Sequence, residues 1–197
     1  MYCMVLKKSF GKIFNNFAPA WYCQERCIFK QQKILMKNTL LVSLITISSL
    51  TAFSQEKKLY NPEANAAKDI EAAIAKAKAA KKFVLIQAGG NWCGWCIEFA
   101  RFAKATPKID SVIKASFVWY HLNWSKENEN SPIFKKYGYA QRFGFPVFLI
   151  LNEKGERIHT QNSEYLEDGK KSYSPYKVQA FLEMWSPRAL NAKMYGD

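Results

Sequence analysis

The sequence predicts an α/β fold, and two observations lead to that prediction. Segments with helical spacing of apolar residues alternate along the chain with short apolar runs of strand length. The run from Phe83 to Ile86 shows no alternation with polar residues, which is typical of a strand buried on both faces of a sheet.

From residue 61 onward the first predicted elements are a helix, a strand and a second helix. Residues 61–82 are alanine-rich, with apolar residues at helical spacing and lysines elsewhere, which predicts an amphipathic helix covering one face of the sheet. The strand 83–86 follows, and a turn then leads into a helix that continues from Cys96. Pro107 should kink or restart that helix, because proline lacks the N–H that a helix interior needs.

The second half of the chain predicts three further strands and two helices. In order, they are a strand over 117–122, a short helix containing Ile133, Phe134 and Tyr137, a strand over 145–151 with a proline at its start, a hairpin turn at 152–155, a strand over 157–161, and a last helix capped by Ser174 and Pro175.

The segment Trp92-Cys93-Gly94-Trp95-Cys96 follows the first strand, and it holds the only cysteines after residue 27. Two thiols separated by two residues can close a small disulfide ring and open it again. A thiolate at position 93, if a helix begins there, faces unpaired N–H groups and the positive end of the helix dipole. That placement can lower a cysteine pKa from about 8.5 to roughly 3.5–7.5, which favours the thiolate that attacks disulfides.

Two other interpretations of the cysteine pair are a static disulfide and half of a zinc site. A ring of this size constrains little chain, so it contributes little stability through entropy. Zinc needs four ligands, and after residue 27 the only other cysteine or histidine ligands are His121 and His159. Redox exchange is therefore favoured, with no metal and no cofactor, because the electrons pass as thiols.

The WCGWC motif, the later Phe-Pro-Val at 145–147 and the strand, hairpin and helix after it resemble the thioredoxin superfamily. The similarity spans roughly residues 60–187. It implies a thioredoxin-like fold, with a central mixed sheet flanked by helices on both faces. An export signal and extra loops look like those of bacterial periplasmic thioredoxin-like proteins.

The resemblance implies a role for each residue of the two motifs. Cys93 would be the nucleophile, and Cys96 the resolving thiol that releases the mixed disulfide. Pro146 would be a cis proline beside the cysteines, against the alternative of a trans proline that starts a strand. The backbone of Phe145 would pair with the substrate chain.

Trp92 and Trp95 flank the cysteines and could form an apolar rim for unfolded or extended chains, with Trp95 exposed and Trp92 partly packed in the core. The sequence departs from the family at Gln87, where a thioredoxin carries a buried aspartate that accepts the proton of the resolving thiol. Glu98 lies nearby in sequence, on a helix face that is either near the cysteines or solvated. His121 is interpreted as a core histidine.

Residues 36–54 have the pattern of a cleaved export signal: one lysine, a short apolar core, and small residues before a cut after Ser54. The apolar core is shorter than the roughly 20 residues that span a bilayer. We therefore expect residues 1–35 to be a disordered upstream extension from a mis-assigned start, and residues 55–197 to be the thioredoxin-like domain. The alternative is a basic cytoplasmic arm ahead of an uncleaved anchor.

The formal net charge of +13 falls to +7 for residues 55–197, because 1–35 hold six basic residues and one acidic and Lys37 adds one more. The remaining lysines are scattered, which favours a solvated surface over nucleic-acid binding.

Taken with the cysteine motif and the export signal, the sequence predicts an exported, periplasmic thiol–disulfide oxidoreductase, a reductase or isomerase more than an oxidase. We expect a monomer that acts on protein thiols and disulfides and is recharged by a membrane thiol-electron donor. The alternative is a non-catalytic binding or chaperone module.

Overall fold

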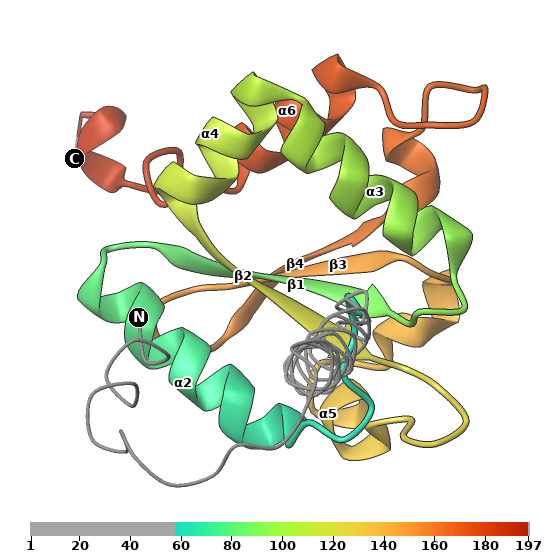
Figure 1. Cartoon of the computed structure of the whole chain (residues 1–197). Helices are drawn as coiled ribbons and strands as arrows, with labels where there is room; N and C mark the ends of the chain where they lie inside the picture. Colours follow the sequence, from blue (N-terminus) through green and yellow to red (C-terminus); the bar gives the residue numbers. More distant parts are fainter. Residues whose placement is uncertain (1–57, 197) are drawn as a thin grey trace, which may run out of the picture. The chain divides into compact units, whose positions relative to one another are not determined.

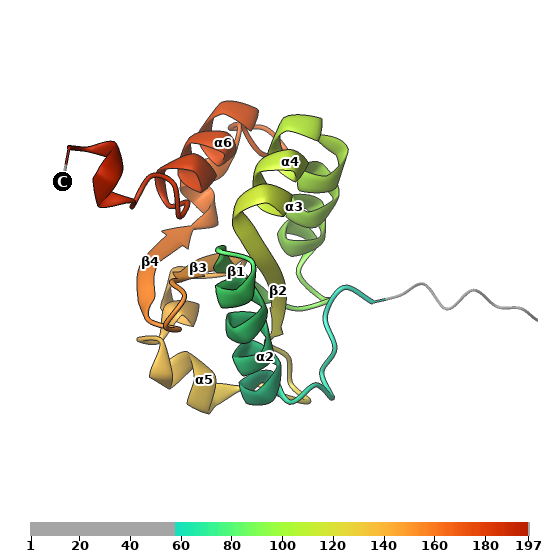
Figure 2. The same ribbon diagram turned by 90° about the vertical axis from the view of Figure 1, so that its left-hand side faces the viewer.

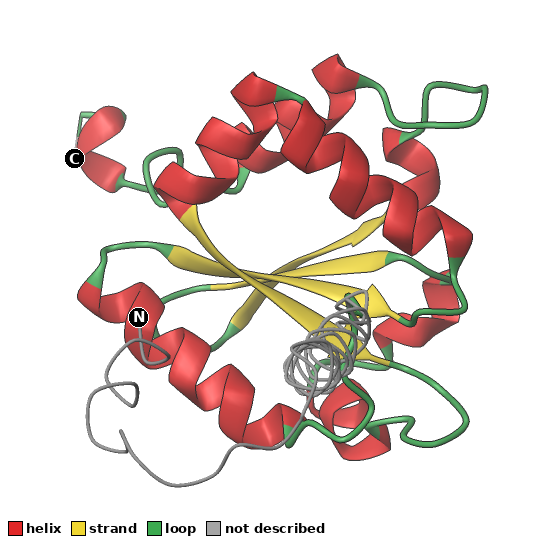
Figure 3. Cartoon of the chain, in the orientation of Figure 1, coloured by secondary structure: helices red, strands yellow, loops and turns green. Residues whose placement is uncertain are grey.

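The computed structural model describes residues 58–196, which contain a four-stranded mixed sheet with helices on both faces (Figures 1 and 3). The predicted extension 1–35 and signal peptide 36–54 lie outside the described residues. No helix within 58–196 combines the length and apolar character that crossing a membrane requires.

The central strand of the sheet is β1 (Phe83–Gly89), and all seven of its residues are buried. It pairs in parallel with β2 (Phe117–Asn123) and antiparallel with β3 (Val147–Leu151). β4 (Arg157–Asn162) pairs antiparallel with β3, which gives the strand order β2-β1-β3-β4. The predicted doubly buried strand is therefore confirmed.

Helices cover both faces of this sheet, as Figure 1 and the turned view in Figure 2 show. One face carries α3 (Gly94–Ala105), α4 (Pro107–Ser116) and α6 (Pro175–Met184). The other face carries α2 (Ala66–Ala79) and α5 (Ser131–Lys136). The predicted α/β class, with a mixed sheet between two helical layers, is confirmed.

The strands fill a separate core on each face, because successive side chains of a strand point to opposite sides. Leu85 packs into the core under α3, α4 and α6 with Phe99 and Phe148. Ile86, the next residue, packs into the core under α2 and α5 with Phe134. Each of these side chains is fully buried, which stabilises the fold by about 1.5–3 kcal/mol apiece.

Most predicted boundaries hold to within a few residues, and the exceptions have local causes. The predicted helix 61–82 is shortened to α2, because the Asn65 side chain accepts from Lys68 N at 3.1 Å and so caps the helix start. Pro107 opens α4 as a new helix, which confirms the predicted restart. β3 begins after Pro146, since proline has no N–H for the sheet.

Three short 3₁₀ helices complete the described residues, and the sequence patterns did not indicate any of them. They are η1 (Ala140–Phe143), η2 (Ser163–Leu166) and η3 (Ala192–Met194). The first leads into Phe145 and Pro146, and the second opens the connection from β4 to α6.

Candidate functional site

The end of β1 and the start of α3 hold the two cysteines. Cys93 is the N-cap residue of α3, and its sulfur accepts a hydrogen bond from Cys96 N at 3.1 Å. The two residues form a disulfide with an S–S distance of 2.01 Å and a Cα–Cα distance of 5.2 Å. Cys93 is 6% exposed and Cys96 is completely buried, so of the two cysteines only Cys93 keeps any exposure to solvent.

Phe145 packs against the buried cluster that contains both cysteines. The peptide bond between Phe145 and Pro146 is cis, as the sequence resemblance implied. Thus the structure brings one residue of the second motif to the first, across about 50 residues of chain. Whether either residue contacts a substrate stays a prediction.

The two tryptophans have exchanged the exposures that the sequence predicted. Trp92 is 60% exposed, although its indole Nε1 donates to Trp124 O at 2.7 Å and its ring meets Phe145 edge-on. Trp95 is half-buried, because its ring packs edge-on against Tyr173 at 5.5 Å. The expectation of an exposed Trp95 was wrong, since the chain between β4 and α6 supplies an aromatic neighbour that local sequence could not indicate.

Gln87 lies beneath the cysteine pair and is fully buried. Its side-chain Nε2 donates to the Tyr60 hydroxyl and to Cys96 O, both at 2.8 Å. Its Oε1 has no hydrogen-bond partner among the described residues. The amide therefore ties α3 to Tyr60 and cannot itself take a proton from Cys96.

Tyr60 belongs to this site although it precedes the first helix by several residues. Its side chain is fully buried in one cluster with Cys93 and Cys96. Asn91, from the loop before the cysteines, fixes its backbone: Asn91 Oδ1 accepts from Tyr60 N at 3.1 Å, and Asn91 Nδ2 donates to Tyr60 O at 2.8 Å. This two-bond clamp joins the chain before α2 to the cysteine loop.

His121 lies on β2 directly opposite Gln87 in the parallel register. Its ring meets the Tyr60 ring edge-on at 5.6 Å, and its Nε2 has no partner among residues 58–196. Burial, with a smaller contribution from Lys104, lowers the pKa of His121 to about 4. It is therefore neutral at neutral pH. The expectation of a core histidine with its hydrogen bonds satisfied is not met in full, because His121 is partly buried and its Nε2 is unpartnered among the described residues.

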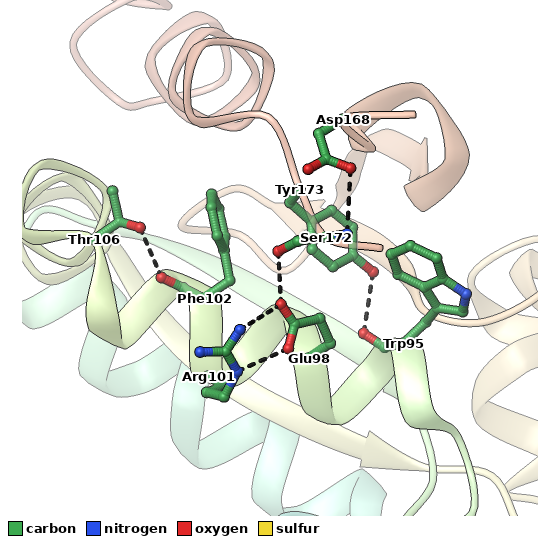
Figure 4. A network of polar contacts seen from close by, with 8 residues as sticks. All are labelled: Trp95, Glu98, Arg101, Phe102, Thr106, Asp168, Ser172 and Tyr173. Atoms are coloured by element: carbon green, nitrogen blue, oxygen red, sulfur yellow. Dashed lines mark hydrogen bonds and ion pairs between the residues drawn. The ribbon is translucent and has the colours of Figure 1, made fainter. Parts of the chain in front are cut away.

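Glu98 lies on the outer side of α3, in the polar network of Figure 4. Its carboxylate pairs with Arg101 at 2.7 Å and accepts from the Ser172 hydroxyl at 2.6 Å. Arg101 first, and then Ser172, lower the pKa of Glu98. The carboxylate is thus occupied on the surface side of the helix, which makes it a poor proton acceptor for Cys96.

Tyr173 flanks α3 on the same side as this network. Its hydroxyl donates to Trp95 O at 3.1 Å (Figure 4). Its ring packs edge-on against Phe99. Sequence reasoning missed both Tyr60 and Tyr173, because neither lies in a periodic segment or a motif.

The residues from 58 to 196 hold no cluster of three or more potential metal ligands.

A family model described as thioredoxin-like matches residues 64–153. Among solved structures, a disulphide isomerase from Xylella fastidiosa Temecula1 is 22% identical, with a TM-score of 0.57 over 65% of this chain and 96% of that one. The C-terminal domain of Neisseria meningitidis DsbD in its oxidised form is 18% identical, with a TM-score of 0.46 over 62% and 97%. A thioredoxin from Thermus thermophilus is 17% identical, with a TM-score of 0.45 over 64% and 88%.

No curated protein matches this sequence. The family-model match, the fold shared with the Xylella structure and the disulfide between Cys93 and Cys96 at a helix start agree with one another. The chain therefore has a thioredoxin-like fold, and the segment that matches the thioredoxin-like family model holds both cysteines.

Proposed function

We propose that this protein is an exported thiol–disulfide oxidoreductase that exchanges disulfides of protein substrates through Cys93 and Cys96. The observation that carries the proposal is the disulfide at the start of α3, in which Cys93 keeps a slight exposure to solvent and Cys96 has none. A reversible dithiol needs this asymmetry, because one thiol must meet the substrate and the other must wait behind it.

The exchange proceeds in two steps that balance in electrons. In the reductive direction, the Cys93 thiolate attacks a substrate disulfide, forms a mixed disulfide and releases one substrate thiolate. The Cys96 thiolate then attacks the Cys93 sulfur, which breaks the bond to the substrate and releases the second thiolate. Two electrons pass to the substrate, and the protein is left with the disulfide described above.

The start of α3 supports the first of these steps. The Cys93 sulfur already accepts a hydrogen bond from Cys96 N, and a thiolate there would keep that partner and gain from the helix dipole. Cys96, one turn further on and fully buried, lacks solvent around its sulfur. We therefore assign nucleophilic attack to Cys93 and resolution to Cys96.

Substrate chains would reach Cys93 over an apolar rim. Trp92 contributes the exposed indole, and Phe145 and Pro146 contribute the backbone edge beside it. Trp95 borders the other side with the part of its ring that Tyr173 leaves open. A rim of aromatic side chains suits extended or unfolded chains, since it offers contact area without requiring a particular sequence.

The second candidate function is a binding or chaperone module in which the disulfide is incidental, and the exposed Trp92 favours considering it. Insulin reduction by a thiol reductant, with and without the protein, separates the two candidates. Catalysis by the native chain that is lost in Cys93→Ser supports the oxidoreductase. Equal rates for both proteins, or no acceleration by either, would favour the binding module.

Export and recharging belong to the same proposal. A reductase outside the cytoplasm receives its electrons across the membrane, so we propose a membrane thiol-electron donor as a partner and a monomeric protein in the periplasm. N-terminal sequencing of the exported protein tests the location. A start near Gln55 supports export with cleavage, whereas a chain that retains residues 1–54 would contradict it.

A further inference from the structure

The cluster beneath the cysteines contains a buried hydroxyl whose hydrogen is unused. The Tyr60 hydroxyl accepts from Gln87 Nε2 at 2.8 Å, which fixes its position. No described residue accepts the hydrogen of this hydroxyl. In the oxidised form this buried donor therefore lacks an acceptor among the described residues. An unsatisfied buried donor costs free energy.

The space beside Gly89 places this hydroxyl in the neighbourhood of the Cys96 sulfur. Gly89, the last residue of β1, has no Cβ, and a Cβ built there would overlap the Cys96 sulfur and lie 3.1 Å from the Tyr60 hydroxyl oxygen. The oxygen and the sulfur therefore border the same small space. Tyr60 and Cys96 also belong to one fully buried cluster.

We propose that the Tyr60 hydroxyl, oriented by Gln87, donates a hydrogen bond to the Cys96 sulfur when the disulfide opens, and so stabilises the thiolate that resolves the mixed disulfide. This inference rests on the proposed exchange function. A sulfur in a disulfide is a weak acceptor, whereas a thiolate carries a full charge and accepts a charge-assisted bond. The donor would thus find its acceptor only in the state that needs it.

Tyr60 only donates a hydrogen bond in this step and does not transfer its proton. The Cys96 thiolate attacks the Cys93 sulfur, the substrate leaves as a thiolate with the electron pair of the broken S–S bond, and this thiolate takes up the proton that Cys96 has given up. Burial raises the pKa of Tyr60 well above the usual value for a tyrosine, so the phenol keeps its hydrogen throughout. In this step the Tyr60 hydroxyl would donate to the reacting sulfur, and Gln87 would act as a positioning residue.

The other titratable groups around this space do not supply the same stabilisation. His121 on β2 packs against the Tyr60 ring and is neutral at neutral pH. Glu98 on α3 is occupied by Arg101 and Ser172 on the outer side of the helix. Cys93, at the start of the same helix, carries the sulfur that Cys96 attacks. Tyr60 is therefore the donor that remains.

The test measures the titration of Cys96 in the full chain with Cys93→Ser, in the presence and absence of Tyr60→Phe. Iodoacetamide alkylation at a series of pH values is followed at Cys96 alone by mass spectrometry, so the cysteines in 1–35 do not interfere. We expect Tyr60→Phe to raise the titration midpoint by about one pH unit, which is about a tenfold loss of thiolate below the midpoint.

Tyr173→Phe is the matched control, because it removes the hydroxyl of a similarly buried tyrosine that packs against the same helix, α3. It should leave the midpoint of Cys96 unchanged. Gln87→Met is a second test that leaves the phenol in place, and it should raise the midpoint by less than Tyr60→Phe does. An unchanged midpoint in Tyr60→Phe, or an equal rise in Tyr173→Phe, would overturn the inference. Since no substrate is involved, this result is independent of whether insulin reduction succeeds.

Discussion

Tyr60 and Tyr173 are the same kind of residue, both almost fully buried against α3, yet their hydroxyls are used differently. The Tyr173 hydroxyl donates to Trp95 O and so holds the helix against the chain between β4 and α6. The Tyr60 hydroxyl only accepts, from Gln87, and lies beside the Cys96 sulfur. The difference teaches that the use of the hydrogen, rather than burial, separates a structural tyrosine from one available for chemistry.

The polar neighbours of the two tyrosines differ in the same way. Around Tyr60, Gln87 Oε1 and His121 Nε2 lack partners among residues 58–196. Around Tyr173, Glu98 and Ser172 bond to each other at the surface. We therefore expect the Tyr60 side to respond to acid and to added volume, and the Tyr173 side to tolerate change.

The largest expected effect is a loss of stability in acid that arises from His121. Folded His121 has a pKa of about 4, whereas an unfolded histidine has its usual 6.5, so the unfolded state binds more protons between these values. Stability is therefore fully present above pH 6.5 and falls as the pH drops toward 4, by up to about 3 kcal/mol for a full shift.

Urea unfolding at a series of pH values measures this loss, with His121→Leu as the comparison. His121→Leu should flatten the dependence in that window and leave a smaller slope from His159, whose pKa burial also lowers. The same slope in both proteins would show that His121 is not the buried group responsible.

Added volume on the Tyr60 side should have the next largest effect. In Gly89→Ala the new methyl group overlaps the Cys96 sulfur, and the disulfide cannot move aside without shifting α3. We expect the oxidised protein to lose about 2 kcal/mol of unfolding free energy, as overpacked cores do.

Gly94→Ala is the matched control, since its Cβ would meet nothing within 4 Å although it lies between the two cysteines. Its stability should equal or slightly exceed that of the native chain. Equal losses in the two variants, measured by urea unfolding, would mean that the space beside Cys96 is not as confined as described.

Removing each tyrosine hydroxyl sharpens the comparison directly. Tyr173→Phe removes the donor to Trp95 O, which should cost the oxidised protein about 1 kcal/mol. Tyr60→Phe removes a hydroxyl whose hydrogen is unused, so its cost should be about 0.5 kcal/mol. A larger cost for Tyr60→Phe in urea unfolding would show that its hydrogen is already bonded in the oxidised form.

The smallest effect should come from the surface network. Ser172→Ala removes one hydrogen bond to a carboxylate that keeps its pair with Arg101, so the expected loss is at most about 0.5 kcal/mol. In a double-mutant cycle with Glu98→Gln, the two losses should be less than additive, because Ser172 acts on Glu98. Full additivity in thermal unfolding would contradict the contact.

The sequence was sufficient for those features of the fold that short-range patterns encode. The apolar run at 83–86 marks a strand because a central strand is covered on both faces, and Pro107 marks a new helix because proline suits a first turn. The predicted start of α2 was too early, because residues 61–65 (Asn-Pro-Glu-Ala-Asn) hold a single alanine and the cap at Asn65 fixes where the helix begins.

The site was predictable where its residues form a motif and not where distant segments meet. Cys93 and Cys96 are recognisable by their spacing. The exposure of Trp95 depends on Tyr173, which is about 80 residues away in the sequence. The sequence around Tyr60 does not predict that its side chain is buried, because its position depends on hydrogen bonds with Asn91 and Gln87.

The two hydrogen bonds between Asn91 and the backbone of Tyr60 tie a residue that precedes α2 to the loop before the cysteines. The surroundings of the cysteines therefore include residues outside the segment that the family model matches. The family-model match covers 64–153, so it includes both cysteines but neither of the two tyrosines that flank their helix. A protein trimmed to that match would keep both cysteines and lose Tyr60, which packs against them, and Tyr173, which holds Trp95. Two relatives with the same sequence over the matched segment can therefore differ in the surroundings of their second cysteine, because residues outside that segment supply them.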